Sequence, residues 1–487
     1  MKVGLLFTVL VMLFCIEANA QWTELRVDIQ GCWGSDVQAI DYDMDGDLDL
    51  FISGSTDPSG NGLAKLYRNN SNGTFTFIPV SIKGFYKGCS AWADFDRDGR
   101  MDFVTTGRNN ESEPPFTLLY QGSAKGSFTP KDVGWLGLYY AWVDCGDYDN
   151  DGLTDILMIG ENGDQDYCRI YRNNGGMSFT CIDVGLQGAA YGQCHFVDFD
   201  NDGDLDISVV GSGQNLLYRN DGGSCFLKHS TGFYPVKYSG SAWGDMDSDG
   251  YPDLIAAGEG TNGPRVDLYH NKGDGSFEEI PMNIPGTLVS NLFWGDFDND
   301  GLLDFLMTGS RDYYGERVVD IYRNKGFHCF EKQEDTFVPI SSGRTIWADL
   351  NNDSKLDIIS VGFNGEDYLA KVYLNNTPNI NVPPTPPIIT YNPATHTIEF
   401  LAGDNSTGQN GITYNLRLGT KPGAEDIFSV LEGQNGFRSV VERGRQKYRF
   451  RLQPGISYYA SAQAIDNSFV GSAFSQEVVL KVKREPR

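Results

Sequence analysis

The chain has 487 residues, of which 40% are hydrophobic and 13% aromatic, so it can bury a core and wholesale disorder is excluded. Its formal net charge of −27 at pH 7 argues against nucleic acid as a partner, because the phosphate backbone carries the same sign. The 58 glycines and the lack of long apolar helical patterns favour an all-β fold of many short strands joined by tight turns.

Residues 1–20 are the first predicted element, a secretory signal peptide. An early cation precedes an apolar run over residues 3–16, and Ala18-Asn19-Ala20 forms an A-x-A cleavage site. The run is too short for a spanning helix, and Phe14 stands where a lipid anchor on Cys15 would require a small residue. We therefore expect no transmembrane segment after cleavage, and a protein that is secreted, extracellular or held at the cell surface.

Next along the chain comes a repeat whose core is the pattern D-x-D-x-D-G-x-x-D. Its copies begin 47 to 53 residues apart, and a period of this length indicates a repeat architecture. Each pattern is followed by an apolar run that ends in Gly, then by a variable loop and a strand of the type L-Y-R-N-N. The seven copies are DYDMDGDLD (41–49), DFDRDGRMD (94–102), DYDNDGLTD (147–155), DFDNDGDLD (198–206), DMDSDGYPD (245–253), DFDNDGLLD (296–304) and DLNNDSKLD (349–357).

Each copy predicts about four short strands, and four-stranded units repeated around a circle form a β-propeller. We therefore predict a seven-bladed β-propeller over residues 21–376. The seventh copy lacks its last strand, while WTELRVDI (22–29) precedes the first copy unpaired, so we expect this segment to close the ring. Aromatic residues two positions ahead of the first Asp are expected to pack between blades: Trp92, Phe196, Trp243, Trp294 and Trp347.

Positions within each acidic loop are counted here from its first Asp. Side chains at positions 1, 3, 5 and 9 can surround one point when the backbone curls, Gly at position 6 permits the turn, and the carbonyl of position 7 adds an oxygen. A flexible set of hard oxygens suits Ca²⁺ better than Mg²⁺, which demands a stricter octahedron. The loops lack the Glu at position 12 and the following helix of an EF-hand.

The expected ligands to as many as seven Ca²⁺ ions are, loop by loop, Asp41, Asp43, Asp45, Asp47 and Asp49; Asp94, Asp96, Asp98, Arg100 and Asp102; Asp147, Asp149, Asp151, Leu153 and Asp155; Asp198, Asp200, Asp202, Asp204 and Asp206; Asp245, Asp247, Asp249, Tyr251 and Asp253; Asp296, Asp298, Asp300, Leu302 and Asp304; and Asp349, Asn351, Asp353, Lys355 and Asp357. In the seventh loop Asn351, Ser354 and Lys355 depart from the pattern, so we expect weaker binding or an empty site there. Without metal each loop is a cluster of repelling carboxylates, and we expect calcium to stabilise the fold rather than to catalyse a reaction.

These loops, each followed by an apolar strand and a Gly, resemble FG-GAP/VCBS repeats, the units of the integrin α-subunit propeller. The resemblance covers residues 22 to about 376. It implies a seven-bladed propeller with calcium in the hairpin between the first two strands of each blade. Propellers of this type act in adhesion, in glycan binding and beside carbohydrate-active enzymes, so the resemblance leaves the function open.

The remainder of the chain is predicted to be a Pro-rich linker over residues 377–387 and a small β-sandwich over residues 388–487. The stretch LQPGISYYASAQAID resembles the fibronectin type III pattern, which implies that Tyr458 is a corner tyrosine. We expect a spacer or docking module.

Eight of the nine cysteines follow the signal peptide. A turn at Asn174-Gly175 would place Cys168 directly opposite Cys181, and this pair is then either a cross-strand disulfide or two buried free thiols. The other six cysteines have no spacing that fixes partners.

No catalytic motif is present, and the five histidines occupy non-equivalent positions of the repeat. The loops between blades carry aromatic residues that suit either sugar stacking or a protein partner, or that plug the central channel. These residues are Trp33, Phe85, Tyr86, Trp135, Tyr139, Tyr140, Tyr191, Phe233, Tyr234 and Tyr238.

Three functions fit these features. The first is a non-catalytic, calcium-stabilised binding protein for a glycan or an extracellular protein, acting in adhesion or recognition. The second is a polysaccharide-active enzyme of the lyase type, in which Lys87, Lys237 or Arg344 lies near an inter-blade tyrosine. The third is an architectural module without a small ligand.

Overall fold

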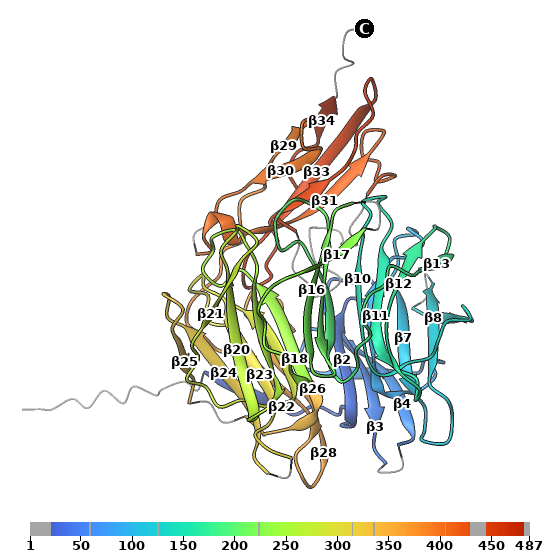
Figure 1. The fold of residues 1–487 in the computed structure, drawn as a ribbon, viewed down its shortest axis with the longest axis vertical. Helices are drawn as coiled ribbons and strands as arrows, with labels where there is room; N and C mark the ends of the chain where they lie inside the picture. The colour runs from blue at the N-terminus through green and yellow to red at the C-terminus, as the bar shows by residue number, and fades with distance from the viewer. Residues whose placement is uncertain are drawn as a thin grey trace, which may run out of the picture.

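The structure is a computed structural model that describes residues 21–57, 60–123, 126–222, 225–313, 315–334, 337–404, 406–428 and 445–481. The predicted signal peptide, residues 1–20, lies outside the described residues. Within the described ranges the fold is all-β, with seven four-stranded sheets and two three-stranded sheets (Figure 1). The all-β prediction is confirmed.

The first six four-stranded sheets each consist of four consecutive antiparallel strands. They are β2 (Trp33–Ile40), β3 (Asp49–Ser55), β4 (Gly62–Asn69) and β5 (Phe75–Ile78); β6 (Tyr86–Ala93), β7 (Asp102–Arg108), β8 (Phe116–Gly122) and β9 (Phe128–Lys131); β10 (Tyr139–Gly146), β11 (Asp155–Glu161), β12 (Asp166–Asn173) and β13 (Phe179–Ile182); β14 (Gln193–Val197), β15 (Asp206–Gly211), β16 (Gln214–Asn220) and β17 (Phe226–His229); β18 (Lys237–Gly244), β19 (Asp253–Gly260), β20 (Gly263–Asn271) and β21 (Phe277–Ile280); and β22 (Leu288–Gly295), β23 (Asp304–Ser310), β24 (Arg317–Asn324) and β25 (Phe330–Lys332).

The seventh sheet closes the ring with a strand from the other end of the propeller. It contains β26 (Ser341–Ala348), β27 (Asp357–Phe363), β28 (Tyr368–Asn375) and, beyond β28, the N-terminal β1 (Trp22–Leu25). Trp22 pairs with Asn375 and Leu25 with Val372. The first strands of successive sheets pack against one another, and β26 packs against β2. The prediction that the N-terminal strand completes the last sheet is confirmed, although the strand is shorter than residues 22–29.

The C-terminal module pairs β29 (Ile388–Asn392), β30 (Thr397–Leu401) and β32 (Lys447–Arg449) in one sheet, and β31 (Thr413–Gly419), β33 (Ser457–Ile465) and β34 (Val478–Lys481) in the other. A short 3-10 turn, η1, covers Gln409–Gly411. Side chains from both sheets share one apolar core that includes Leu416, Tyr448 and Ala460. No helix in the described ranges has the length and apolarity needed to cross a bilayer.

The aromatic residues ahead of the acidic loops lie where core packing requires them. Trp92, Trp294 and Trp347 are buried, and Phe196 and Trp243 are half-buried against neighbouring apolar clusters. The prediction that these rings pack between sheets is therefore confirmed.

The predicted pairing of Cys168 with Cys181 is wrong. Cys181 lies opposite Tyr171, and Cys168 lies opposite Ile159 on the other neighbouring strand. The reason is the length of the turn, since Asn173 pairs with Phe179 and the N–H of Asn174 donates to the carbonyl of Ser178. A turn of five residues shifts the register that a two-residue turn would set. Cys168 is a buried free thiol, whereas the thiol of Cys181 is free and exposed.

A buried ion pair joins the last sheet to the first inside the ring. Arg344 of β26 donates to Asp36 of β2 at 2.5 Å, and the guanidinium carbon lies 4.4 Å from the ring centre of Trp142. The Asp36 carboxylate also accepts hydrogen bonds from the N–H and the hydroxyl of Ser90, at 2.9 and 2.5 Å. Both charged side chains are buried.

We expect Asp36→Asn to lower the free energy of unfolding by about 3–5 kcal/mol, because it leaves a buried guanidinium without its counter-charge. Urea unfolding in a buffer that contains Ca²⁺ measures this. Glu24→Gln is the matched control, since Glu24 also joins the ends of the ring through Lys371 of β28, but at the surface. Its effect should stay within about 1 kcal/mol. Equal effects of the two changes would contradict a buried role for the Asp36 pair.

Candidate metal centres and the opposite face of the ring

Each acidic loop connects the first two strands of a sheet and is curled by its own backbone. In the fourth loop the Asp198 carboxylate accepts hydrogen bonds from the N–H groups of Asp202, at 3.0 Å, and Gly203, at 2.9 Å. All seven loops repeat this pair of bonds with lengths of 2.7–3.1 Å. The curl requires left-handed residues, and Gly203 has a φ of +93°. Position 1 is thus directed toward the inside of the loop.

The position-9 carboxylate is anchored to two elements of its sheet. In the fourth loop Asp206 accepts hydrogen bonds from the N–H of Phe199, at 3.1 Å, and from the N–H of Asn220 in the third strand, at 2.8 Å. Equivalent bonds recur in the other six loops. Positions 1 and 9 are therefore held before any cation arrives.

The carboxylates of the loops converge as a Ca²⁺ site requires. In the second, third and fourth loops one oxygen from each of positions 1, 3 and 9 lies within 4.8 Å of the others, and in the first loop the same holds for positions 1, 3 and 5. Oxygens that share one Ca²⁺ at 2.3–2.6 Å each lie no farther apart than about 5 Å. One buried oxygen at position 3 has no hydrogen-bond partner in three loops: Asp149, Asp200 and Asp298. These residues fit a hard cation.

The electrostatics of the loops favour the same ligand. Burial raises the pKa of Asp49 to about 8. Backbone hydrogen bonds to its carboxylate lower the pKa in part, and the neighbouring carboxylates raise it further. Burial raises the pKa of Asp155 and of Asp206 to about 9. A buried carboxylate that cannot pair with a cation takes up a proton instead. The position-9 carboxylates of the first, third and fourth loops therefore hold either a proton or a cation at neutral pH.

The remaining predicted loop residues take different partners. Arg172 contacts Asp149 and Asp151 at 2.5 and 2.7 Å, and in the sixth loop an arginine does the same for positions 3 and 5. The N–H of position 7 donates to the position-5 carboxylate in all seven loops. In the seventh loop Ser354 adopts a φ of +62° and keeps its bond to Asp349 at 2.8 Å, so the curl survives the loss of Gly.

An asparagine at the end of the third strand links neighbouring sheets, a role that sequence reasoning missed. The side-chain amide of Asn220 donates to the carbonyl of Tyr148, at position 2 of the preceding acidic loop, at 2.9 Å. Six sheets repeat this bond, through Asn69, Asn173, Asn220, Asn271, Asn324 and Asn375. The Asn that recurs at the end of the L-Y-R-N strands was the sequence signal for this link. The second sheet has Gly122 at this position and lacks the bond.

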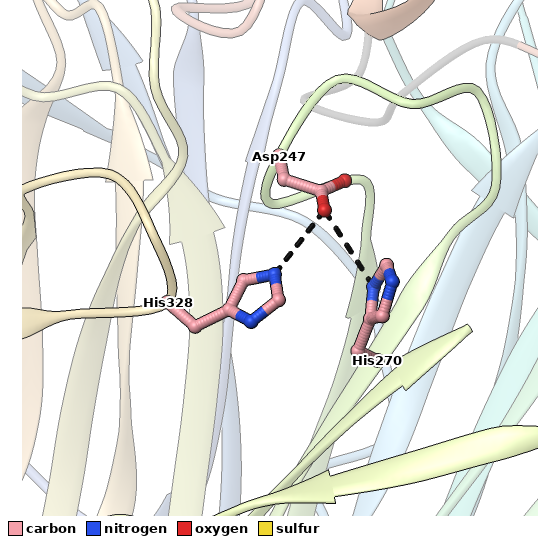
Figure 2. A group of neighbouring side chains, drawn as sticks. All are labelled: Asp247, His270 and His328. Atoms are coloured by element: carbon pink, nitrogen blue, oxygen red, sulfur yellow. Dashed lines mark hydrogen bonds and ion pairs between the residues drawn. The ribbon is translucent and has the colours of Figure 1, made fainter. Parts of the chain in front are cut away.

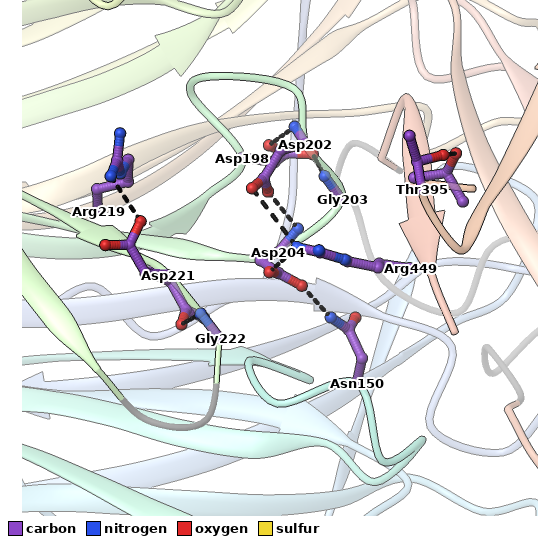
Figure 3. A network of polar contacts seen from close by, with 12 residues as sticks. Asn150, Asp198, Asp202, Gly203, Asp204, Arg219, Asp221, Gly222, Thr395 and Arg449 are labelled. Atoms are coloured by element: carbon purple, nitrogen blue, oxygen red, sulfur yellow. Dashed lines mark hydrogen bonds and ion pairs between the residues drawn. The ribbon is translucent and has the colours of Figure 1, made fainter. Parts of the chain in front are cut away.

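The C-terminal module packs on the acidic-loop end of the ring (Figure 1). Arg449 of β32 donates to Asp204 at 2.5 Å, and Asn150 of the third loop donates to the same carboxylate at 2.6 Å (Figure 3). At the sixth loop the hydroxyl of Ser468 donates to Asn299 at 2.7 Å. The module thus covers the side of the ring where the predicted calcium ligands lie.

A cavity of about 480 Å³ lies inside the ring beneath this module. The first strand of every sheet contributes to its wall, and Tyr448 and Arg445 of the module line its end. Burial lowers the pKa of His195 in this wall to about 4, and its Nε2 atom lies 3.0 Å from the hydroxyl of Ser241. This histidine is therefore neutral at physiological pH. The side chains in the wall are Gln38, Ser90, Trp142, His195, Ser241, Phe293 and Arg344.

The opposite face carries a second repeated feature. Six of the first strands contain a register shift near their start, at the end farthest from the acidic loop. In six sheets one residue at this place, and in the fourth sheet Tyr191 just ahead of β14, has a left-handed φ between +45° and +57°. We call these residues the bulge ring; they are Gly34, Lys87, Tyr140, Tyr191, Tyr238, Val289 and Ser342. Non-glycine residues adopt this conformation at a cost, and such strain concentrates at functional sites.

Aromatic side chains of the bulge ring contact one another. Tyr140 and Tyr191 stack with ring centres 3.9 Å apart, and Tyr191 meets Tyr238 at 5.2 Å. The Lys87 ammonium lies 5.1 Å from the ring centre of Tyr140 and donates to Glu111 at 2.7 Å. The three tyrosines are half-buried, so each presents part of its ring to solvent. This face combines aromatic surface with charged groups.

The predicted inter-blade aromatic residues divide between this face and the core. Tyr139, Tyr140, Tyr191, Tyr238 and Trp33 are half-buried around the bulge ring. By contrast, Phe85, Tyr86 and Phe233 are buried, Trp135 stacks on Tyr171 at 4.0 Å, and Tyr234 lies under Arg265.

The three cations considered for a lyase are also separated. Lys87 lies beside the tyrosines of the bulge ring, whereas Arg344 is buried with Asp36 and has no tyrosine partner among its described contacts. Lys237 is exposed at the start of β18, next to Tyr238 in the chain.

Comparison with known proteins identifies the repeat. The sequence pattern of the FG-GAP-like repeat matches residues 41–105, 94–158, 147–209, 198–256 and 245–307. No curated protein matches the chain.

Three solved structures are similar at low identity. A lectin from Agrocybe aegerita that recognises non-reducing terminal N-acetylglucosamine is 19% identical over 62% of this chain and 80% of its own, with a TM-score of 0.44. The extracellular domain of a protein described as a hybrid two-component system from B. thetaiotaomicron is 12% identical over 95% of this chain and 58% of its own, with a TM-score of 0.41. A fructofuranosidase from Schwanniomyces occidentalis is 10% identical over 94% of each chain, with a TM-score of 0.29.

These distant likenesses leave the ligand open. The family matches together span residues 41–307, which is more than half of the chain. The chain therefore belongs to the FG-GAP-like repeat family.

Proposed function

We propose that this protein is a secreted, calcium-stabilised β-propeller of seven blades that binds an extracellular glycan through its bulge ring. The observation that carries the proposal is the row of Tyr140, Tyr191 and Tyr238 at equivalent, strained positions on one face, with the first pair stacked and the second pair edge to face. Aromatic rings pack on the apolar faces of sugars, and nearby polar groups bind the hydroxyls.

Calcium in the acidic loops would pair with the partnerless position-3 oxygens and with the position-9 carboxylates whose pKa values burial raises. The protein would hold up to seven Ca²⁺ ions through the loop residues given above, with the seventh loop the weakest. The ions would supply positive charge that fixes each hairpin. The hydrogen bonds from the third-strand Asn amides would then link each fixed loop to the next blade.

The C-terminal module has the features of a fibronectin type III-like sandwich. Two three-stranded sheets share one core, and the hydroxyl of Tyr458 accepts a hydrogen bond from the N–H of Gln453 at 3.0 Å, as a corner tyrosine does. Because this module covers the acidic-loop side, it leaves the bulge ring as the side of the propeller that a large ligand reaches. A glycan polymer suits that open side.

Lyase chemistry at the bulge ring is less well supported than binding. A lyase needs a base that loses its proton near neutral pH. Hydrogen bonds to Glu111 and Tyr140 outweigh burial and raise the pKa of Lys87, and burial raises the pKa of Tyr191 far above its ordinary range. Both shifts keep these groups protonated. They remain suited to donating hydrogen bonds to a ligand.

The test is a panel of polysaccharides and oligosaccharides applied to the folded protein in calcium. We expect retention of at least one glycan class, and we expect Tyr191→Ala to weaken its binding by roughly 30-fold or more, as for a central aromatic anchor. Isothermal titration calorimetry gives the affinities. Tyr459→Ala in the C-terminal module is the matched control and should change nothing.

Two outcomes would overturn the proposal. Folded protein that retains no glycan class would move the function to an extracellular protein partner or to an architectural role. Equal binding by the wild type and the Tyr191→Ala variant would move the site away from the bulge ring.

A further inference from the structure

A cluster of two histidines and one carboxylate lies between the fifth and sixth sheets. His270 belongs to the third strand of the fifth sheet, β20, and His328 to the turn between β24 and β25 of the sixth. Both face Asp247 of the fifth acidic loop (Figure 2). The Asp247 Oδ2 atom lies 3.6 Å from His270 Nδ1 and 3.2 Å from His328 Nε2.

The two histidines depart from the repeat at the same junction. At the position of His270 four other copies carry Arg and one carries Gln, and three of these side chains contact the carboxylates of their own loop. At the position of His328 three other copies carry Gly and one carries Met177, all with positive φ. His328 occupies this place with a φ of +58°, at a conformational cost that Gly avoids.

The separations match the edges of a tetrahedral metal site. Ligand atoms about 2.0–2.1 Å from Zn²⁺ lie roughly 3.3–3.5 Å apart. The separations of 3.2 and 3.6 Å between Asp247 and the two histidines bracket that value. The three ligand atoms all lie within 4.8 Å of one another, and the ring centres of the histidines are 4.9 Å apart.

We propose that His270, His328 and Asp247 bind one transition-metal ion of the Zn²⁺ class, with water as its fourth ligand. Imidazole nitrogen selects such ions over Ca²⁺, which prefers oxygen. The site is separate from the bulge ring, because it lies beside the acidic loops at the opposite end of the propeller. It does not depend on the proposed function.

The site also adjoins the fifth acidic loop. Asp247 is position 3 of that loop, so a Ca²⁺ held there would use the second carboxylate oxygen, and the two ions would share one side chain. Asp253, at position 9, lies 3.1 Å from His270 Nδ1 and accepts hydrogen bonds from the N–H groups of Met246 and Asn271. A metal-bound Nδ1 carries no proton to donate to Asp253, so Asp253 stays with the calcium loop.

The experiment is titration of the full chain, kept in excess Ca²⁺, with Zn²⁺ by calorimetry and with Co²⁺ by visible absorption. We expect saturable binding of one ion and a Co²⁺ spectrum of nitrogen and oxygen ligands. His328→Asn removes the imidazole but keeps a residue that tolerates positive φ, so the fold should be unaffected. It should weaken binding by at least roughly 100-fold, more than the loss of an outer-shell contact causes.

His229→Asn in the neighbouring sheet is the matched control and should bind Zn²⁺ as the wild type does. Three results would each overturn the site. They are no saturable binding by the wild type, equal binding by the His328→Asn variant, and a thiolate charge-transfer band, which would assign the ion to the exposed Cys329.

Discussion

Excess EDTA at pH 7.5 is expected to lower the unfolding temperature by on the order of 15 °C, because it would remove the calcium that we propose for the acidic loops. Each of the six complete loops contributes about 2.7 kcal/mol when free Ca²⁺ is near 100 times its dissociation constant, or on the order of 16 kcal/mol together. For a chain of this length 1 kcal/mol corresponds to roughly 1 °C. Differential scanning calorimetry measures the shift, and adding Ca²⁺, but not Mg²⁺, should restore it.

A single loop variant makes this test specific. Asp200→Asn removes a position-3 carboxylate whose buried oxygen has no hydrogen-bond partner. In calcium it should destabilise the protein, because a ligand is lost; in EDTA it should stabilise it, because a buried charge is lost. The exposed Asp164→Asn is the matched control and should have no effect in either condition. An unfolding temperature insensitive to EDTA would contradict calcium in the loops.

The second large effect is a reversal of the pH dependence of stability by calcium. Burial raises the pKa of Asp94 and Asp349 to about 6, and that of Asp155 and Asp206 to about 9, against an ordinary value of about 3.9. A raised folded-state pKa contributes stability that is complete below the unfolded pKa and is lost as pH rises through the folded one. In EDTA the free energy of unfolding should therefore fall between pH 5 and pH 8, by on the order of 10 kcal/mol.

With calcium present the trend should invert, because protons compete with the ion for the same carboxylates much more strongly at pH 5 than at pH 8. Urea unfolding at the two pH values, with and without EDTA, measures both slopes. Asp206→Asn should flatten the slope in EDTA by removing one titrating group. A metal-free protein that gains stability from pH 5 to pH 8 would contradict buried, unpaired carboxylates in the loops.

The acidic loops and the four-strand period were predictable because both are local. A loop that presents oxygens to one point needs them at fixed positions in the chain, so the pattern from Asp198 to Asp206 is visible in nine residues. Ring closure was also predictable. The N-terminal strand has no partner in the first sheet and the last sheet lacks a fourth strand, so pairing the two removes both exposed edges.

Other features depend on contacts that no short stretch encodes. In the bulge ring Lys87, Tyr140 and Tyr191 have a left-handed φ, which such residues rarely adopt. The residues next to them in the chain carry no pattern that predicts this conformation. The docking of the module rests on pairs such as Asp204 with Arg449, which are 245 residues apart. The register of β13, which places Cys181 opposite Tyr171, depends on the five-residue length of the turn that precedes it.

We propose the bulge ring as the ligand-binding face of the propeller. The most direct measurement is hydrogen–deuterium exchange of the calcium-loaded full chain, with and without the glycan that binds best in the panel. We predict slower exchange on ligand addition in peptides that carry Lys87, Tyr140, Tyr191 and Tyr238, and unchanged exchange in the acidic loops. Slower exchange confined to the C-terminal module or to the acidic loops, with the bulge ring unchanged, would contradict ligand binding at the bulge ring.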